Sequence, residues 1–134
     1  MTPAYLDANF FILYNFDQTS RGETARRIHE KILGGSMRAV TSALALDEVM
    51  WVIIKNKRSE VLRETIEDIF AMQNLTVKDV YSSTPLDALY YINEYDLKPR
   101  DAFHIAIMKA SGISEIISDD HDFDRVKGIK RTRL

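Results

Sequence analysis

Acidic side chains occur at four places in the chain where the neighbouring sequence is apolar. Asp7 follows a short apolar segment and is the first charged residue of the chain, and Glu48 lies inside the apolar segment 44–54. Asp101 stands near the start of a third apolar segment. The fourth place is residues 118–124, where Ser-Asp-Asp-His-Asp-Phe-Asp holds four aspartates in six residues. Because like charges this close repel one another unless a cation or a proton relieves them, the loop is a candidate cation site.

Each of these acids also has a structural explanation that needs no ligand. Asp7 suits the N-cap of a following helix, and Glu48 could extend from a helix into solvent. Asp101 falls in the first turn of a predicted helix, where the helix dipole favours an acid. Residues 118–124 could simply form an exposed acidic loop. Taken one at a time, the acids leave both explanations open.

A shared site is favoured because all four places lie at the ends of predicted strands or on helices that flank them. The chain contains no cysteine, and carboxylates that converge without cysteine suit a hard cation, Mg²⁺ or Mn²⁺. Such an ion positions phosphate oxygens and activates water. We therefore predict a metal site formed by Asp7, Glu48, Asp101 and Asp120.

The pattern of apolar residues predicts strands that alternate with helices. The predicted strands are residues 3–6, 38–41, 75–80, 115–118 and 129–133. After the apolar segment 9–16, the predicted helices are residues 20–33, 42–55, 84–95 and 99–111, with a further one that starts at Ser59. Ser20 and Glu23 form a capping box for the helix 20–33. This alternation predicts a three-layer α/β/α domain with a mainly parallel central sheet, in which sites form at the carboxyl ends of the strands.

Length and composition predict one globular domain over residues 1–134. Eighteen Lys and Arg against 20 Asp and Glu give a net charge of -2, so there is no overall basic surplus that would indicate nucleic-acid binding. The apolar stretches are too short to cross a membrane. No Lys or Arg precedes Arg21, which argues against a signal peptide, and we expect a cytoplasmic protein.

Four segments, in order, resemble the motifs of the PIN-domain nucleases, and most of all those of the small VapC-type toxins of toxin–antitoxin pairs. The segments are Tyr5-Leu-Asp7-Ala-Asn9, Thr41-Ser-Ala-Leu-Ala-Leu-Asp-Glu48, Lys98-Pro-Arg-Asp101-Ala-Phe-His-Ile-Ala and Ser118-Asp-Asp120-His-Asp122-Phe-Asp124. The resemblance runs from about residue 3 to residue 130. It implies a PIN-like parallel sheet between layers of helices, an acidic pocket at the strand ends, and metal-dependent cleavage of RNA phosphodiester bonds.

The resemblance also assigns roles to single residues. Three acids of the family pocket are matched by Asp7, Glu48 and Asp101, with the glutamate a metal ligand directly or through water. The family's Ser/Thr-x-Asp step fits Ser118 and Asp120, which makes Asp120 the fourth ligand. Asp122 then matches a frequent auxiliary acid and is a further candidate ligand.

Neighbouring residues are expected to support these acids. Asn9 matches a polar residue often found beside the first acid. His104 lies one turn after Asp101 and is better explained as a hydrogen-bonded, partly buried histidine than as a metal ligand. The acidic loop has one more aspartate than the family pattern requires, so the main fourth ligand stays open among Asp119, Asp120 and Asp122.

Basic residues near the acidic loop are predicted to guide RNA phosphates rather than to select bases. They are Arg100, Arg125, Lys127, Lys130, Arg131 and Arg133. For any single one of them, a solvated charged edge is the simpler explanation. Together they predict RNA binding that weakens as the salt concentration rises.

The chain has more apolar residues on its helices than one small sheet can cover, which predicts a homodimer and a groove for a protein antitoxin. The residues concerned are Phe10, Phe11, Ile12, Leu13, Tyr14, Met50, Trp51, Ile53 and Ile54. The alternative is that they are core residues of a dense domain. The resemblance implies both partners as well.

Competing functions fit the sequence less well. A phosphotransfer receiver domain needs a phospho-accepting aspartate after a mid-chain strand, and an apolar helix occupies that place here. A dinucleotide-binding domain needs a glycine-rich turn after the first strand, which this sequence lacks. The remaining alternative is a catalytically silent PIN-like module that only binds RNA or protein. The presence of all four expected acids argues against that alternative.

Overall fold

A five-stranded parallel sheet forms the centre of the protein, in a computed structural model that describes residues 2–134. The strands lie in the order β3-β2-β1-β4-β5, and every pairing between neighbours is parallel. Their bounds are β1 Ala4–Leu6, β2 Ala39–Ser42, β3 Leu75–Lys78, β4 Glu115–Ile117 and β5 Lys130–Thr132. Met1 belongs to the predicted domain but lies outside the described residues.

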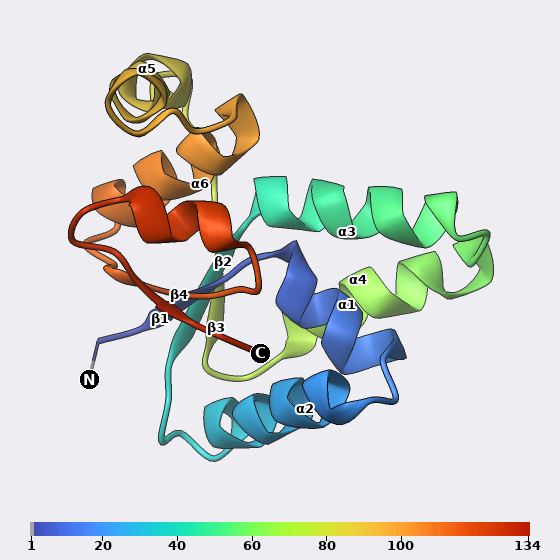
Figure 1. The fold of residues 1–134 in the computed structure, drawn as a ribbon. Coiled ribbons are helices and arrows are strands. Elements are labelled where there is room, and N and C mark those ends of the chain that lie inside the picture. The colour runs from blue at the N-terminus through green and yellow to red at the C-terminus, as the bar shows by residue number, and fades with distance from the viewer. Residues whose placement is uncertain (1) are drawn as a thin grey trace.

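Helices cover both faces of the sheet, so the predicted three-layer α/β/α architecture is confirmed (Figure 1). The helices are α1 Ala8–Phe16, α2 Ser20–Leu33, α3 Ala43–Lys55, α4 Leu62–Ala71, α5 Thr84–Tyr95 and α6 Pro99–Ala110. Two short 3₁₀ helices follow α3 and β4, η1 Ser59–Val61 and η2 His121–Arg125. Within the described part of the chain, no helix is long and apolar enough to cross a bilayer.

The core is divided in two by the sheet because successive strand residues point to opposite faces. On β1, Ala4 and Leu6 join the core formed with α1, α2, α3 and α4. Tyr5, between them, joins the core formed with α5, α6 and η2. All three side chains are buried, which explains why the strand reads as a continuous apolar run.

The strands on either side of β1 come from different parts of the chain. From β1 the chain adds β2 and then β3 on one side, and only later adds β4 and β5 on the other side. The point where the direction changes lies between β1 and β4, where Leu6 pairs with Ile117. In doubly wound sheets the crevice at such a switch point is where ligands bind. Asp7 and Ser118, the next residues of the two strands, are therefore neighbours at that crevice.

Several predicted helix starts were wrong by a residue or more. The N-cap of α2 is Thr19, whose side chain accepts a hydrogen bond from the Arg21 backbone, and Ser20 is already helical. The N-cap of α5 is Ser83 instead of Thr84. Ser59 begins a short 3₁₀ turn, and the regular helix starts three residues later. Each miss reflects adjacent Ser and Thr residues or a tightened first turn, which sequence alone resolves poorly.

The predicted apolar partner surface is only partly present. Phe10, Phe11, Leu13 and Ile53 are core residues, so this part of the prediction was wrong, because α1 packs between the sheet, α2 and α3. Exposed apolar side chains do remain on α3, namely Met50, Trp51 and Ile54. A second exposed set lies on α5 and was not predicted, namely Leu86, Leu89 and Tyr90.

Candidate metal centre at the carboxyl end of the sheet

Asp7 lies at the carboxyl end of β1 and is buried, with 8% of its surface exposed. Its Oδ1 accepts a 2.9 Å hydrogen bond from the Asn9 backbone N–H, so Asp7 is the N-cap of α1. Its Oδ2 accepts a 2.5 Å hydrogen bond from the Ser118 hydroxyl, which comes from the end of β4. Burial raises the pKa of Asp7 to about 6, against the opposing effect of the Ser118 hydrogen bond. The capping explanation therefore holds for Asp7, and its carboxylate lies at the place where the metal site is predicted.

The segment after β4 places two of its aspartates, Asp120 and Asp122, beside Asp101 of α6. Ser118 Oγ accepts a hydrogen bond from the Asp120 backbone, and Asp120 Oδ1 accepts one from the Asp122 backbone at the start of η2. Asp101, in the first turn of α6, faces this loop. One carboxylate oxygen from each of Asp101, Asp120 and Asp122 lies within 4.8 Å of the others. The structure thus brings together three of the predicted metal ligands.

The geometry and chemistry of this aspartate cluster fit a hard divalent cation. Mg²⁺ holds oxygen ligands at about 2.1 Å, so two oxygens on opposite sides of the ion are about 4.2 Å apart. Neighbouring ligands on the same ion are about 3.0 Å apart, so the three carboxylate oxygens, which lie within 4.8 Å of one another, move inward when they hold one ion. Burial raises the pKa of Asp101 to about 6, and the charge of Asp120 adds to this effect. Carboxyls that resist ionisation because of their negative neighbours are those that a bound cation stabilises most.

Glu48 extends from α3 toward the same region and is partly buried. A cavity of about 460 Å³ is lined by Asp7, Glu48, Asp119 and Asp120, with Asn9 beside them. Negative charge from Glu48 contributes to the raised pKa values of both Asp7 and Asp101. Three of the four predicted acids, Asp7, Glu48 and Asp120, therefore line one cavity, and Asp120 also belongs to the aspartate cluster with Asp101.

His104 is hydrogen-bonded, as the explanation preferred from sequence holds, but it is fully buried instead of partly buried. Its side chain is 2% exposed, and its Nε2 lies 2.5 Å from Oε1 of Glu48. Its other ring nitrogen contacts the Tyr5 hydroxyl. Tyr5 was not predicted as a polar partner. The signal was present, since Tyr5 stands two residues before Asp7 in a strand.

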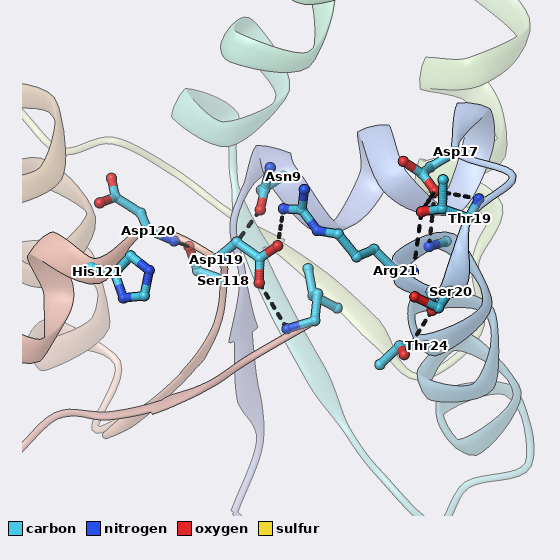
Figure 2. A network of polar contacts seen from close by, with 12 residues as sticks. Asn9, Asp17, Thr19, Ser20, Arg21, Thr24, Ser118, Asp119, Asp120 and His121 are labelled. Atoms are coloured by element: carbon cyan, nitrogen blue, oxygen red, sulfur yellow. Dashed lines mark hydrogen bonds and ion pairs between the residues drawn. The ribbon is translucent and has the colours of Figure 1, made fainter.

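Asp119 is engaged apart from the aspartate cluster (Figure 2). One of its oxygens pairs with the Arg21 guanidinium and the other accepts a 2.9 Å hydrogen bond from the Leu134 backbone. Its own backbone N–H donates to Oδ1 of Asn9. Asp119 therefore anchors α2 and the end of the chain to the strand end. Sequence reasoning missed Arg21, which lies 98 residues away from its partner.

The predicted phosphate contacts differ in how far they are engaged by acids of the protein itself. Arg131 has a side chain only 9% exposed, donates to both oxygens of Asp124, and also donates to the Ser118 carbonyl. Its guanidinium stabilises the acidic loop through these contacts and is therefore not available to bind an RNA phosphate. Arg125 donates to the Asp96 carbonyl and pairs with Asp122, and Lys130 lies 4.0 Å from Glu115.

Three of the predicted basic residues remain available on the surface. They are Arg100, Lys127 and Arg133. All three are exposed, and across residues 2–134 none of them takes part in an ion pair. Only these three keep unpaired positive charge in the predicted set.

Comparison with known proteins agrees with this architecture. Residues 4–129 match the family described as PIN domain. Ribonuclease VapC13 of Mycobacterium tuberculosis is 33% identical over 109 residues, which span 80% of this chain and 82% of that protein.

Solved structures share the fold. The Mycobacterium tuberculosis VapC20, described as a sarcin-ricin loop cleaving toxin, superposes with a TM-score of 0.72 at 20% identity, over 90% of this chain and 92% of that one. VapBC2 of Rickettsia felis, solved bound to a promoter DNA fragment, gives a TM-score of 0.73 at 14% identity, over 98% of both chains.

Proposed function

Because this chain belongs to the PIN domain family, we propose that it is a metal-dependent endoribonuclease and the toxin of a type II toxin–antitoxin pair. A relative at 33% identity is named a ribonuclease, and the alignment covers most of both chains. The proposal includes a single nuclease domain over residues 1–134. It also places the protein in the cytoplasm, where it would encounter its RNA substrate.

One observation carries the proposal, which is the meeting of carboxylates at the switch point of the sheet. Oxygens of Asp101, Asp120 and Asp122 lie within 4.8 Å of one another. Asp7 and Glu48 line the adjoining cavity. These five acids come from the end of β1, from α3, from α6, from the loop after β4 and from η2, so the whole fold is needed to assemble them.

The proposed roles follow from this placement. Asp101, Asp120 and Asp122 hold Mg²⁺ or Mn²⁺, with Asp7 completing the site from β1. When bound, the ion orients the scissile phosphate, neutralises developing charge and lowers the pKa of an attacking water. Glu48 is a ligand directly or through a water molecule. The Ser118 hydroxyl holds Asp7 in place and, by donating to it, favours its ionised form.

The proposed partners are RNA, a protein antitoxin and a second copy of this chain. Arg100, Lys127 and Arg133 are the surface charges available for RNA phosphates. Two separate apolar sets, on α3 and on α5, are available to the protein partners. One structural relative was solved as a toxin–antitoxin complex from Klebsiella pneumoniae, with a TM-score of 0.66.

The proposal is tested by Asp101→Asn, with Asp87→Asn as the matched control. Both aspartates lie two residues after a proline in the first turn of a helix, so both variants lose the same helix-dipole interaction. Cleavage of total bacterial RNA with Mn²⁺ should fall at least about 100-fold in Asp101→Asn and should stay at the parent rate in Asp87→Asn.

The alternative function, a silent PIN-like binding module, predicts a different result. The parent protein would then bind RNA but would not cleave it at any Mn²⁺ concentration. Equal cleavage by the parent and by Asp101→Asn would instead place the chemistry elsewhere in the molecule.

A further inference from the structure

A buried chain of hydrogen bonds ends at the carboxylate of Glu48. Ser42 Oγ lies 2.7 Å from the Tyr5 hydroxyl, which lies 2.6 Å from Nδ1 of His104. Nε2 of His104 lies 2.5 Å from Oε1 of Glu48. Tyr5 and Ser42 are fully buried and His104 is 2% exposed. Of the four side chains, only Glu48 reaches the cavity.

The donors and acceptors in this chain fit a single direction. An ionised carboxylate only accepts, so Nε2 of His104 carries the hydrogen that Glu48 receives. In the neutral imidazole, Nδ1 then accepts from the Tyr5 hydroxyl, whose oxygen can accept from Ser42. Ser42 Oγ also accepts from the Ala45 backbone as the N-cap of α3. Throughout residues 2–134, no buried side-chain polar atom lacks a partner.

The chain of contacts joins the elements that carry the candidate metal ligands. Tyr5 lies on β1 two residues before Asp7, and His104 lies on α6 three residues after Asp101. The Tyr5 and His104 rings pack edge to face with centroids 5.5 Å apart. Phe123 of η2 also packs edge to face against the imidazole, with ring centroids 6.4 Å apart. The imidazole is therefore held by two rings and two hydrogen bonds, and it has little freedom to turn.

We propose that Tyr5 and His104 are positioning residues that hold Glu48 in one orientation at the metal site, so that its second carboxylate oxygen faces the cavity. This inference rests on the proposed nuclease function. Glutamate has three rotatable side-chain bonds, and ordering them at the moment of metal or substrate binding costs free energy. A carboxylate already fixed through one oxygen avoids that cost.

A three-variant series separates positioning from general stability. His104→Leu removes both hydrogen bonds and keeps an apolar side chain of similar size. His104→Gln keeps an amide N–H able to reach Glu48 from the same helix position. Tyr5→Phe removes only the hydroxyl. Met108→Ala is the control, because Met108 is fully buried one turn further along α6 and belongs to the same hydrophobic core cluster as Tyr5.

Two quantities are measured for each variant, at a temperature where circular dichroism shows the native fold. The first is Mn²⁺ affinity, obtained by calorimetry without RNA. The second is the pair of steady-state constants for RNA cleavage, kcat and KM, determined separately. His104→Leu should weaken Mn²⁺ binding or lower kcat by about 10- to 100-fold with KM unchanged. His104→Gln should recover most of the lost Mn²⁺ affinity or kcat. Tyr5→Phe should lower the same quantity several-fold, and Met108→Ala should keep the parent values of both.

A double variant tests whether His104 acts through Glu48. Adding His104→Leu to Glu48→Gln should cost less than 2-fold beyond Glu48→Gln alone, because the glutamate is no longer there to position. Additive losses would overturn the proposal, as would parent-like kcat and Mn²⁺ affinity in His104→Leu. If His104→Leu fails to fold, parent-like values in Tyr5→Phe overturn it in the same way.

Failure of the positioning proposal and failure of the nuclease proposal give different results. A parent protein that cleaves RNA, together with a His104→Leu variant that cleaves equally well, contradicts only the positioning role. A parent protein that neither binds Mn²⁺ nor cleaves RNA contradicts the nuclease function on which the inference rests, and overturns both.

Discussion

Ser118 and Asp7 lie 111 residues apart in the sequence, yet the Ser118 hydroxyl donates a 2.5 Å hydrogen bond to Oδ2 of Asp7. The contact crosses the junction between β1 and β4, where the direction of strand addition changes. It partly offsets the effect of burial on the pKa of Asp7, which is nevertheless raised to about 6. The order of the strands is thus linked directly to the ionisation of a candidate metal ligand.

Removal of this hydroxyl should weaken the metal site. In Ser118→Ala, Asp7 loses a donor and the Asp120 backbone N–H loses its acceptor. The pKa of Asp7 then rises further, and we expect Mn²⁺ affinity at pH 7 to fall by about 10-fold. Calorimetric Mn²⁺ titrations measure this, with Ser114→Ala as the control at the other end of the same strand. Equal affinities in the two variants would mean that Ser118 does not influence the site.

Asp101 should destabilise the metal-free protein at neutral pH. Its folded pKa is about 6 against an ordinary value of 3.8, with burial as the main cause. Between these two values the folded state binds more protons than the unfolded state, so stability falls as the pH rises through that range. Asp101→Asn removes this loss and should raise the melting temperature of the metal-free protein by a few degrees at pH 7.5. At pH 3 the two proteins should melt together.

Divalent metal should reverse the order of the melting temperatures of the parent protein and Asp101→Asn. Mn²⁺ binds the folded parent protein and raises its melting temperature, whereas Asp101→Asn lacks one ligand. At millimolar Mn²⁺ and pH 7.5, the parent protein should melt above the variant. If Mn²⁺ shifts both proteins equally, Asp101 is not part of the metal site.

The adjacent aspartates 119 and 120 should differ sharply in their effect on cleavage. Asp120 belongs to the aspartate cluster, whereas Asp119 pairs with Arg21 and accepts from the Leu134 backbone. Asp120→Asn should lower cleavage at least about 100-fold, while Asp119→Asn should change it less than about 5-fold. Parallel RNA cleavage assays of the two variants decide the register of the loop. The opposite ranking would make Asp119 the ligand.

The basic residues should separate into structural and RNA-binding sets. Arg131→Ala removes hydrogen bonds to Asp124 and to the Ser118 carbonyl, and should lower the melting temperature. Lys127→Gln and Arg133→Gln should leave stability unchanged. Each should reduce the salt dependence of RNA binding by about 0.7 in the log–log slope, the value for one single-strand phosphate contact. An unchanged slope in the double variant would exclude these two residues from the RNA path.

Most of the fold could be predicted because it is encoded locally. The continuous apolar run of β1, the proline that opens α6 and the periodic apolar face of α2 each indicate an element without reference to distant residues. The acids at the strand ends were visible for the same reason. Adjacent hydroxyl residues such as Thr19 and Ser20 compete for the same cap, and only the structure decides between them.

The contacts that decide the role of each charge could not be predicted, because they depend on long-range packing. Arg131 looks like any tail arginine in the sequence, yet it folds back on Asp124 and the strand end. Asp119 and Asp120 are neighbours that face different partners. The core position of Phe10 and Phe11 likewise depends on how α1 packs among the sheet, α2 and α3.

The metal centre is tested most directly by an anomalous difference map from a crystal of the parent protein grown with Mn²⁺. We predict one strong peak about 2.2 Å from carboxylate oxygens of Asp101, Asp120 and Asp122, on the side of the crevice that Asp7 and Glu48 line. A fully occupied peak elsewhere, or no peak at saturating Mn²⁺ with these carboxylates ordered, would contradict the account.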